Sequence, residues 1–321
     1  MKDEALVARV ADSIYWMNRY IERAENISRF INVNVHLILD LGFEGSVSQW
    51  EALVVATGDE KAFKARYDSY SEENVIRFLT FDIENPNSIV SCVMNARENA
   101  RAVREVISSE MWEHLNSYYH LIQKNQSKTL AFDLQSFFEK VKLAGHLFIG
   151  LSETTMSRGQ AWHFGRLGRV LERADKTSRI MDVKYFILLP TPADVGSSID
   201  AVQWGALLKS TSAFEMYRKR FHTINYRDVA NFLIFDGDFP RSFRFCVETA
   251  LYSLECIVER CHNEGTALAE IKTLKSLLDK TNVDEVLRSG LHEFVDVFQR
   301  NLNIVDRAIH DSFISRHRSG S

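Results

Sequence analysis

A charged pattern of 15 residues occurs twice in this chain, once near its start and once near its middle. Residues 17–31 read MNRYIERAENISRFI, and residues 167–181 read LGRVLERADKTSRIM. On a helix with 3.6 residues per turn, the first copy has one apolar face and one face rich in Arg and Glu. Six matched positions carry the same residue: Arg19 and Arg169, Glu22 and Glu172, Arg23 and Arg173, Ala24 and Ala174, Ser28 and Ser178, and Arg29 and Arg179.

Three further blocks recur in the same order. Residues 49–53 (QWEAL) match 203–207 (QWGAL), residues 62–63 match 213–214, and residues 78–93 (FLTFDIENPNSIVSCV) match 232–247 (FLIFDGDFPRSFRFCV). The four offsets are 150, 154, 151 and 154 residues. The last block holds eight identities where composition alone would give about one. We therefore expect an internal duplication, with halves 1–153 and 154–321 packed as one compact unit about a pseudo-twofold axis.

Helix-breaking residues are scarce, since the 321 residues include only 4 Pro and 14 Gly. Long uninterrupted elements favour helix over a many-stranded sheet. The fold class that we expect is all-α, a compact multi-helix bundle. The predicted helices are residues 3–41, 46–57, 60–69, 72–81, 87–108, 109–124, 129–151, 156–188, 199–211, 213–222, 226–235, 241–263, 265–281 and 283–312.

Charge and hydropathy narrow the possible partners. The formal net charge is −4, whereas a nucleic-acid-binding domain is usually basic. No apolar run reaches transmembrane length, and the first ten residues, MKDEALVARV, do not resemble a signal peptide. The four cysteines form no CxxC pair, which is typical of reduced thiols. We expect a cytoplasmic protein without a nucleic-acid or membrane partner, and the oligomeric state stays open.

The two Glu-Arg segments are the first candidate site. If they pack together, the charged residues of one face those of the other, and positive charge is in excess. Burying that excess is costly unless further carboxylates or an anionic ligand neutralise it. The candidate ligand-binding residues are Arg19, Glu22, Arg23, Arg29, Arg169, Glu172, Arg173 and Arg179. The alternative is a structural network of ion pairs that fixes the register of the helices.

Two other basic stretches are candidates. Arg97, Arg101 and Arg104 form one helical stripe, and the matching stretch of the second half, ETALYSLECIVE, has no Arg. Arginine suits bidentate recognition of carboxylate or phosphate, although neighbouring Glu residues could neutralise the stripe on a solvated face. The start of the second Glu-Arg helix adds Arg158, His163 and Arg166. A single histidine there is more often structural than a catalytic base.

Signatures of catalysis and of metal binding are weak. Glu259 and His262 form one ExxH pair, whereas a carboxylate-bridged di-metal bundle needs two such motifs. The chain has no phosphate-binding glycine loop, no GxSxG and no HExxH. No metal is expected, and no cofactor is predicted in this chain. If the chain is an enzyme, Glu22 or Glu172 is the candidate acid/base, although neighbouring Arg would lower its pKa.

Four stretches together resemble the bacterial alpha-E family, named for an α-helical domain with a Glu-Arg motif. They are ADSIYWMNRYIERAENISR, NPNSIVSCVMNARENARAVREVISSEMWEHLN, MSRGQAWHFGRLGRVLERADKTSRI and FDGDFPRSFRFCV. The resemblance covers nearly the whole chain. Asn18 and Lys176 depart from the pattern, where Gly and a second Asn are expected.

The resemblance implies partners more than a mechanism. Members of this family accompany a circularly permuted ATP-grasp protein and a transglutaminase-like peptidase, so ATP and Mg would act through the ATP-grasp partner. ATP-grasp proteins commonly form amide bonds. We therefore expect an accessory or substrate-binding component of an amide- or peptide-forming system, which binds an anionic group through its Arg and Glu residues. The alternatives are an enzyme that uses Glu22 or Glu172, and a purely structural scaffold.

Overall fold

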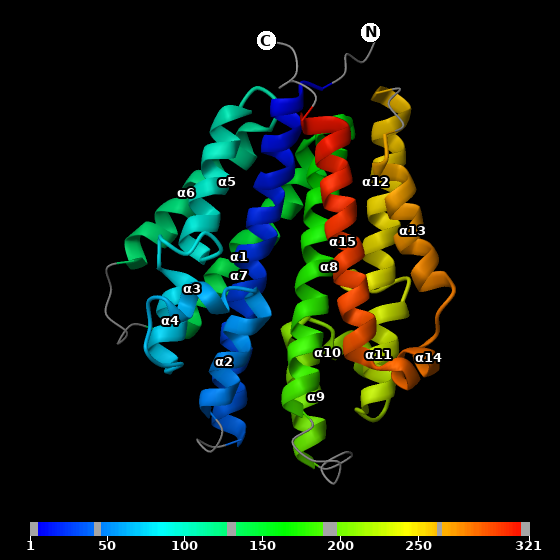
Figure 1. Cartoon of the computed structure of the whole chain (residues 1–321). Coiled ribbons are helices and arrows are strands. Elements are labelled where there is room, and N and C mark those ends of the chain that lie inside the picture. Colours follow the sequence, from blue (N-terminus) through cyan, green and yellow to red (C-terminus); the bar gives the residue numbers. More distant parts are fainter. Residues whose placement is uncertain (1–5, 42–45, 127–132, 189–197, 262–264, 316–321) are drawn as a thin grey trace.

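The computed structural model describes residues 6–41, 46–126, 133–188, 198–261 and 265–315. Every regular element within these ranges is a helix, which confirms the expected all-α class. Two long helices, α1 (Ala8–Leu41) and α8 (Gln160–Leu188), pack against each other in the middle of the molecule. Both begin at the end where the chain termini lie (Figure 1).

The remaining helices are arranged around this central pair. Those that follow α1 are α2 (Ser46–Thr57), α3 (Glu60–Lys64), α4 (Glu72–Thr80), α5 (Ile89–Ala102), α6 (Ser109–Gln126) and α7 (Leu134–Thr155). Those that follow α8 are α9 (Ser198–Ser210), α10 (Phe214–Arg220), α11 (Tyr226–Phe235), α12 (Phe243–Cys261), α13 (Ala267–Asp279), α14 (Val283–Ser289) and α15 (Leu291–Ile309), which continues into a π-helix (His310–Ile314). α1 packs on α5 and α7, and α8 packs on α12 and α15.

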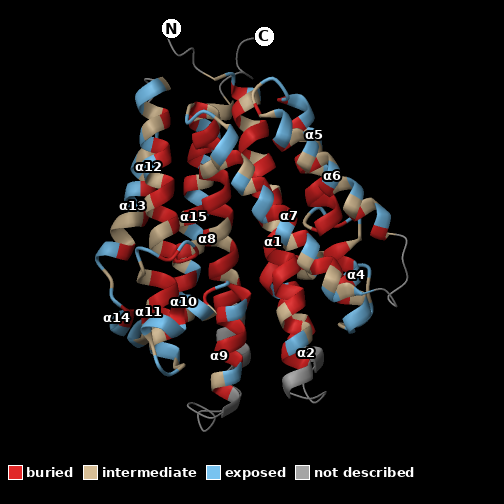
Figure 2. Ribbon diagram, turned by 180° about the vertical axis from the view of Figure 1, so that it is seen from behind, coloured by how far each residue is buried: buried red, intermediate tan, exposed pale blue. Residues whose placement is uncertain are grey.

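The apolar face of α1 forms much of the core. Met17, Ile21 and Ala24 are fully buried, as are Leu167 and Ala174 on α8. Buried residues follow both central helices, whereas exposed residues gather on the outer helices (Figure 2). Unusually for two such helices, their polar faces are buried as well, because each turns its Glu-Arg pattern toward the other.

Local contacts recur at an offset of 154 residues. Helices α2 and α9 end alike: the hydroxyl of Thr57 donates to the Val54 carbonyl, and that of Thr211 donates to the Leu208 carbonyl. The next residue has positive φ in both cases, +81° at Gly58 and +53° at Ser212. The left-handed region suits glycine and costs other residues free energy, so the turn itself holds Ser212 there.

Aromatic packing corrects one block of the sequence alignment. Phe63 meets Phe78 edge-on at 5.1 Å, and Tyr217 meets Phe232 edge-on at 5.7 Å. Phe63 therefore corresponds to Tyr217, at an offset of 154, and not to Phe214. The matching of residues 62–63 with 213–214 at an offset of 151 was wrong, because Phe and Tyr fill equivalent space without being identical.

The predicted helix 283–312 was wrong in its continuity. Gly290 separates α14 from α15 with φ +106°, and a side chain there would collide with Glu293. The helices predicted for residues 60–69 and 87–108 both end early, at Lys64 and Ala102. The other predicted helices agree with the structure to within a few residues, or extend into residues outside the described ranges.

The Glu-Arg seam and the arginine cluster beside it

Reciprocal ion pairs join the two central helices. Glu22 on α1 accepts hydrogen bonds from Nε and Nη2 of Arg173 on α8, both at 2.8 Å. Glu172 on α8 accepts them from Nε and Nη2 of Arg23 on α1, at 2.6 and 2.9 Å. Both carboxylates are buried, with side chains 1% and 0% exposed. We call these four residues, with Arg19 and Arg169, the Glu-Arg seam.

The two outer arginines of the seam pair with other helices. Arg19 donates to Glu172 at 2.9 Å and to Asp306 on α15 at 2.5 Å. Arg169, at the position that matches Arg19, donates to Glu153 on α7 at 2.8 Å. The excess of positive charge expected from the sequence is therefore reduced by carboxylates from outside the repeated motif.

One further cation lies beside each of the two buried glutamates of the seam. It is Arg241 beside Glu22, and Lys176 beside Glu172. Arg241, just before α12, donates to Glu22 at 3.1 Å and to Asn26 at 2.9 Å. Its counterpart in the other half is Asn87, which accepts a bond from Arg23 at 2.5 Å. There the added cation is Lys176, 3.6 Å from Glu172 and at the position that matches Asn26. A cation and an asparagine have exchanged places between the halves.

Further ion pairs lie along α1 and α8 next to the seam. Arg241 also donates to Glu25 at 3.0 Å, and Glu25 forms a buried ion pair with Arg29. In the other half, Arg179 donates to Asp175 at 2.9 Å. The Nη1 group of Arg29 has no hydrogen-bond partner among the described residues. Each arginine of both motifs thus pairs with a carboxylate of the chain, and Arg29 also has a buried donor group without an acceptor among the described residues.

The electrostatic environment keeps both seam glutamates ionised. Burial by itself would raise the pKa of Glu22, but Arg173 and Arg241 hold that pKa well below its usual range. Burial likewise opposes ionisation of Glu172, and the cations around it, Arg23 first, still lower its pKa strongly. A carboxylate with a depressed pKa and saturated hydrogen bonds is a weak general base.

Glycines allow α1 and α8 to approach closely. A Cβ atom at Gly168 would lie 2.5 Å from the carbonyl oxygen of Tyr15, and one at Gly165 would lie 2.7 Å from Asn18 Nδ2. Neither distance is sterically allowed. The two glycines therefore permit the close crossing of α1 and α8. Asn18, which departs from the family pattern, fills the contact opposite Gly165 and donates to the Ile14 carbonyl at 3.0 Å.

The stripe on α5 does not join the seam. Arg97 donates to Asn116 at 2.8 Å and lies 4.7 Å from the ring centroid of Tyr119. Arg104 lies 4.8 Å from Trp112. Arg101 pairs with Glu98 at 2.8 Å in an exposed contact. Arg97 and Arg104 therefore pack against α6, whereas Arg101 lies on the surface.

A separate group of cations surrounds the start of α8. Arg166 lies 5.2 Å from the ring of Trp162 and 5.8 Å from that of Tyr252, which is an exposed residue of α12. Arg158 lies 4.8 Å from Trp162, and Arg260 donates to the Arg158 carbonyl at 3.4 Å. We call Arg158, Arg166 and Arg260 the arginine cluster. Glu153 lies 3.6 Å from Arg158, whereas no carboxylate of a described residue lies within 4.0 Å of Arg166.

His163 is a buried residue next to the arginine cluster. Its ring is 4% exposed, and it meets Trp162 edge-on at 4.9 Å and Tyr252 at 6.0 Å. Its Nδ1 has no hydrogen-bond partner among the described residues. Burial, together with the positive charges of the arginine cluster, lowers the pKa of His163 to about 4. The ring is neutral at physiological pH, and a bound anion would raise its pKa.

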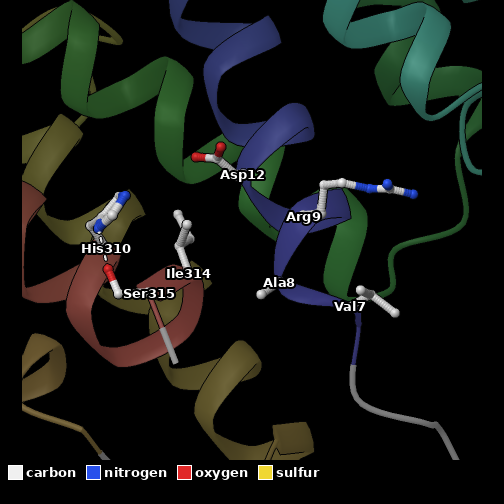
Figure 3. Close-up of a pocket in the computed structure, with 7 residues that line it drawn as sticks. All are labelled: Val7, Ala8, Arg9, Asp12, His310, Ile314 and Ser315. Atoms are coloured by element: carbon white, nitrogen blue, oxygen red, sulfur yellow. Dashed lines mark hydrogen bonds between the residues drawn. The ribbon is translucent and has the colours of Figure 1, made fainter. Parts of the chain in front are cut away.

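A pocket of 690 Å³ lies between the start of α1 and the π-helix that follows α15 (Figure 3). Asp12 on α1 faces it together with His310, whose Nδ1 lies 2.7 Å from the hydroxyl of Ser315. Asp12 Oδ1 has no hydrogen-bond partner among the described residues, and burial raises the pKa of Asp12. In Figure 3 the guanidinium of Arg9 extends away from His310. The carboxylate and imidazole here are separate from the Glu-Arg seam.

The described part of the chain contains no group of three or more His, Cys, Asp or Glu residues placed to hold a metal ion. His262, one member of the ExxH pair, lies outside the described residues. The four cysteines are free thiols. Within the described ranges, no helix combines the length and apolar character needed to span a bilayer.

Residues 6–314 match the model of a family described as "a predicted alpha-helical domain with a conserved ER motif". This chain belongs to the Alpha-E family. Curated relatives include Uncharacterized protein Mb2597 of Mycobacterium bovis, 23% identical over 258 residues, and Uncharacterized protein Rv2567 of Mycobacterium tuberculosis, 22% identical over 258 residues. Each match covers 75% of this chain but only 29% of the relative. No solved structure matches the chain.

Residues outside the Alpha-E motif that complete the seam were missed from the sequence. They are Asn87, Glu153, Arg241 and Asp306. One signal was present: Asn87 and Arg241 are aligned but differ within the best-matched block of the repeat. Arg260 of the arginine cluster and the neighbouring Tyr252 gave no such signal, because the matching positions of the first half hold residues of other kinds, Val106 and Glu98.

Proposed function

We propose that this Alpha-E chain is an accessory, substrate-binding component of an ATP-grasp-linked system that forms amide or peptide bonds. ATP and Mg would be bound by the ATP-grasp partner, and a transglutaminase-like peptidase would act in the same system. The observation that carries the binding role is Arg166, held between Trp162 and Tyr252 with no carboxylate within 4.0 Å among the described residues. Its guanidinium is available to a carboxylate, a phosphate or an acyl phosphate.

In this proposal the seam is the framework and the arginine cluster is the ligand site. The reciprocal pairs Glu22–Arg173 and Glu172–Arg23 support two tandem halves, 1–153 and 154–321, related by a pseudo-twofold axis. An isologous contact brings each motif against the other in this way. The seam arginines do not contact the bound anion in this proposal. Arg169 and Arg158 both pair with Glu153, so the seam holds the start of α8 and the arginine cluster in place.

The size of the relatives supports an accessory role. The region similar to this chain makes up 29% of their length, so a unit of this kind operates there within a much longer polypeptide. An enzyme that uses Glu22 or Glu172 is disfavoured, because Arg neighbours depress the pKa of both carboxylates.

Calorimetric titration with inorganic phosphate and with acetyl phosphate tests the binding site. We expect both anions to bind to the wild type and binding to weaken about ten- to hundredfold in Arg166→Gln, since a charge-assisted hydrogen bond contributes about 1.5–3 kcal/mol. Arg101→Gln is the matched control, because Arg101 is exposed and already paired with Glu98. Equal affinity in Arg166→Gln and the wild type would remove the arginine cluster as the site.

A second experiment tests the partner separately. Co-purification of the tagged chain with the ATP-grasp protein should yield a stable complex, and amide formation by that protein should depend on adding the Alpha-E chain. A partner that neither binds the chain nor responds to it would refute the accessory role, whatever the titrations give.

A further inference from the structure

A second pocket lies at the end of the bundle opposite the chain termini, between α1, α9 and α10 (Figure 1). Its volume is 390 Å³, within the range of small-molecule sites. Val33 and Leu37 of α1, Ala206 of α9, and Phe214 and Ile224 give it apolar walls. Burying a ligand's apolar surface here would contribute about 25 cal/mol per Å².

The rim of this pocket is basic. Lys209 lines it, with Nζ 5.6 Å from the ring centroid of Phe214, and Arg218 lies 5.8 Å from the same ring. His36 also lines the pocket and is exposed. Neither Lys209 nor Arg218 has a carboxylate oxygen of a described residue within 4.0 Å. An apolar cavity with Lys209 in its lining, and with Arg218 against the ring of the lining residue Phe214, is complementary to an apolar body that carries one negative charge.

The other half of the chain has different chemistry at the same place. At an offset of 154, Gly205 matches Glu51, and Lys209 matches Val55. By the same offset, Phe214 corresponds to Glu60 and Ile224 to Tyr70.

In the first half this region is occupied by polar and aromatic groups. Tyr70 stacks on Phe63 at 4.7 Å, and Glu60 pairs with Lys64 at 2.5 Å. Glu51 is close enough to affect the pKa of Tyr70. The second half has thus lost two acids and a phenol and gained a lysine. The second half therefore has more room and more positive charge at this place than the first half, and both differences favour binding of an anion.

We propose that this pocket binds an apolar carboxylate: a molecule or chain end with a hydrophobic body and one terminal carboxyl group. The body lies against Leu37, Phe214 and Ile224, and the carboxylate pairs with Lys209. Gly205 keeps the pocket open, because it supplies no side chain where the first half has Glu51. The site is independent of the arginine cluster and of the amide-forming role.

The test is calorimetric titration of the full-length chain with two probes, octanoate for a free aliphatic acid and N-acetylphenylalanine for a peptide C-terminus, each beside its uncharged amide. We expect at least one acid to bind to the wild type, about tenfold tighter than its amide. The tighter acid identifies the source of the ligand.

Two variants locate the binding. Gly205→Glu places the first half's residue in the pocket, and a Cβ there meets Phe214 and Ile224 at the ordinary distances of 3.7 and 3.8 Å, so the helix tolerates it. We expect binding of the acid to be lost. Lys209→Val, which also copies the first half, should abolish the preference for acid over amide while the amide still binds. Gly150→Glu on α7, where a Cβ meets nothing within 4 Å, controls for added charge and should bind as the wild type.

Three results would overturn the proposal. They are no binding of either acid to the wild type at millimolar concentration, undiminished binding in Gly205→Glu that retains its helical circular dichroism, and an unchanged acid preference in Lys209→Val. Arg166→Gln should still bind the acid as the wild type does, even if it loses phosphate binding, so the two sites are tested separately.

Discussion

Glu22 accepts two hydrogen bonds of 2.8 Å from the Arg173 guanidinium across the interface of the two longest helices. The same contact occurs in reverse between Glu172 and Arg23. A motif that neutralises itself only when two copies meet explains why both charged faces can be buried. Each carboxylate would be strongly destabilising without the arginine of the other copy.

Replacing Glu172 by Gln should therefore destabilise the chain strongly. The substitution removes the negative charge that Arg23 and Arg19 share at Glu172, and breaking such a buried pair costs about 3–5 kcal/mol. Urea unfolding followed by circular dichroism measures the loss. Glu60→Gln, in an exposed pair with Lys64, is the control and should leave the midpoint unchanged. A midpoint for Glu172→Gln equal to that of the control would mean that the seam does not hold the halves together.

The exchange of a cation and an asparagine between the halves predicts a compensating double mutant. Arg241→Asn removes a cation from Glu22, and Asn26→Lys by itself places a second cation beside Arg241. Together the two changes reproduce the arrangement in which Lys176 lies 3.6 Å from Glu172 and Asn87 accepts from Arg23. We expect each single mutant to be destabilised and the double mutant to recover about 1–3 kcal/mol of coupling energy. Additive losses in a double-mutant cycle would contradict the exchange.

How much the sequence could predict depended on whether a contact lies within the repeat. The helical class followed from the scarcity of Pro and Gly. The repeated motif offered the contact between the two Glu-Arg segments only as a possibility, and the structure shows it as the pair Glu22–Arg173. The motif could not predict Asp306 or Glu153, because helical periodicity assigns a residue to a face but does not say which neighbouring helix supplies its counter-ion. The correspondence of Phe63 with Tyr217 was missed for a related reason, since packing conserves ring shape and not residue identity.

The close crossing of α1 and α8 makes Gly168 sensitive to the smallest substitution. In Gly168→Ala the new methyl group would lie 2.5 Å from the Tyr15 carbonyl oxygen, which belongs to the backbone and cannot rotate away. Overpacking of this kind costs about 1–3 kcal/mol. Gly150→Ala is the matched control on α7, because its methyl group meets nothing within 4 Å, and it should be neutral or stabilising by up to about 1 kcal/mol. Thermal unfolding of both variants measures the difference, and equal melting temperatures would show that the helices separate easily.

The buried imidazole beneath the arginine cluster reports on anion binding. Its folded pKa of about 4 is below the value of about 6.5 for an unfolded chain, so His163 binds fewer protons when folded. Its contribution to stability is therefore fully present above pH about 6.5 and is lost as the pH falls toward 4. Titration of the ring by nuclear magnetic resonance should give the low pKa, and the value should rise in Arg166→Gln because one neighbouring positive charge is gone. Phosphate should raise it in the wild type, and the variant should need at least about ten times more phosphate for the same rise. An ordinary pKa that neither phosphate nor the substitution alters would contradict the arrangement of cations around His163.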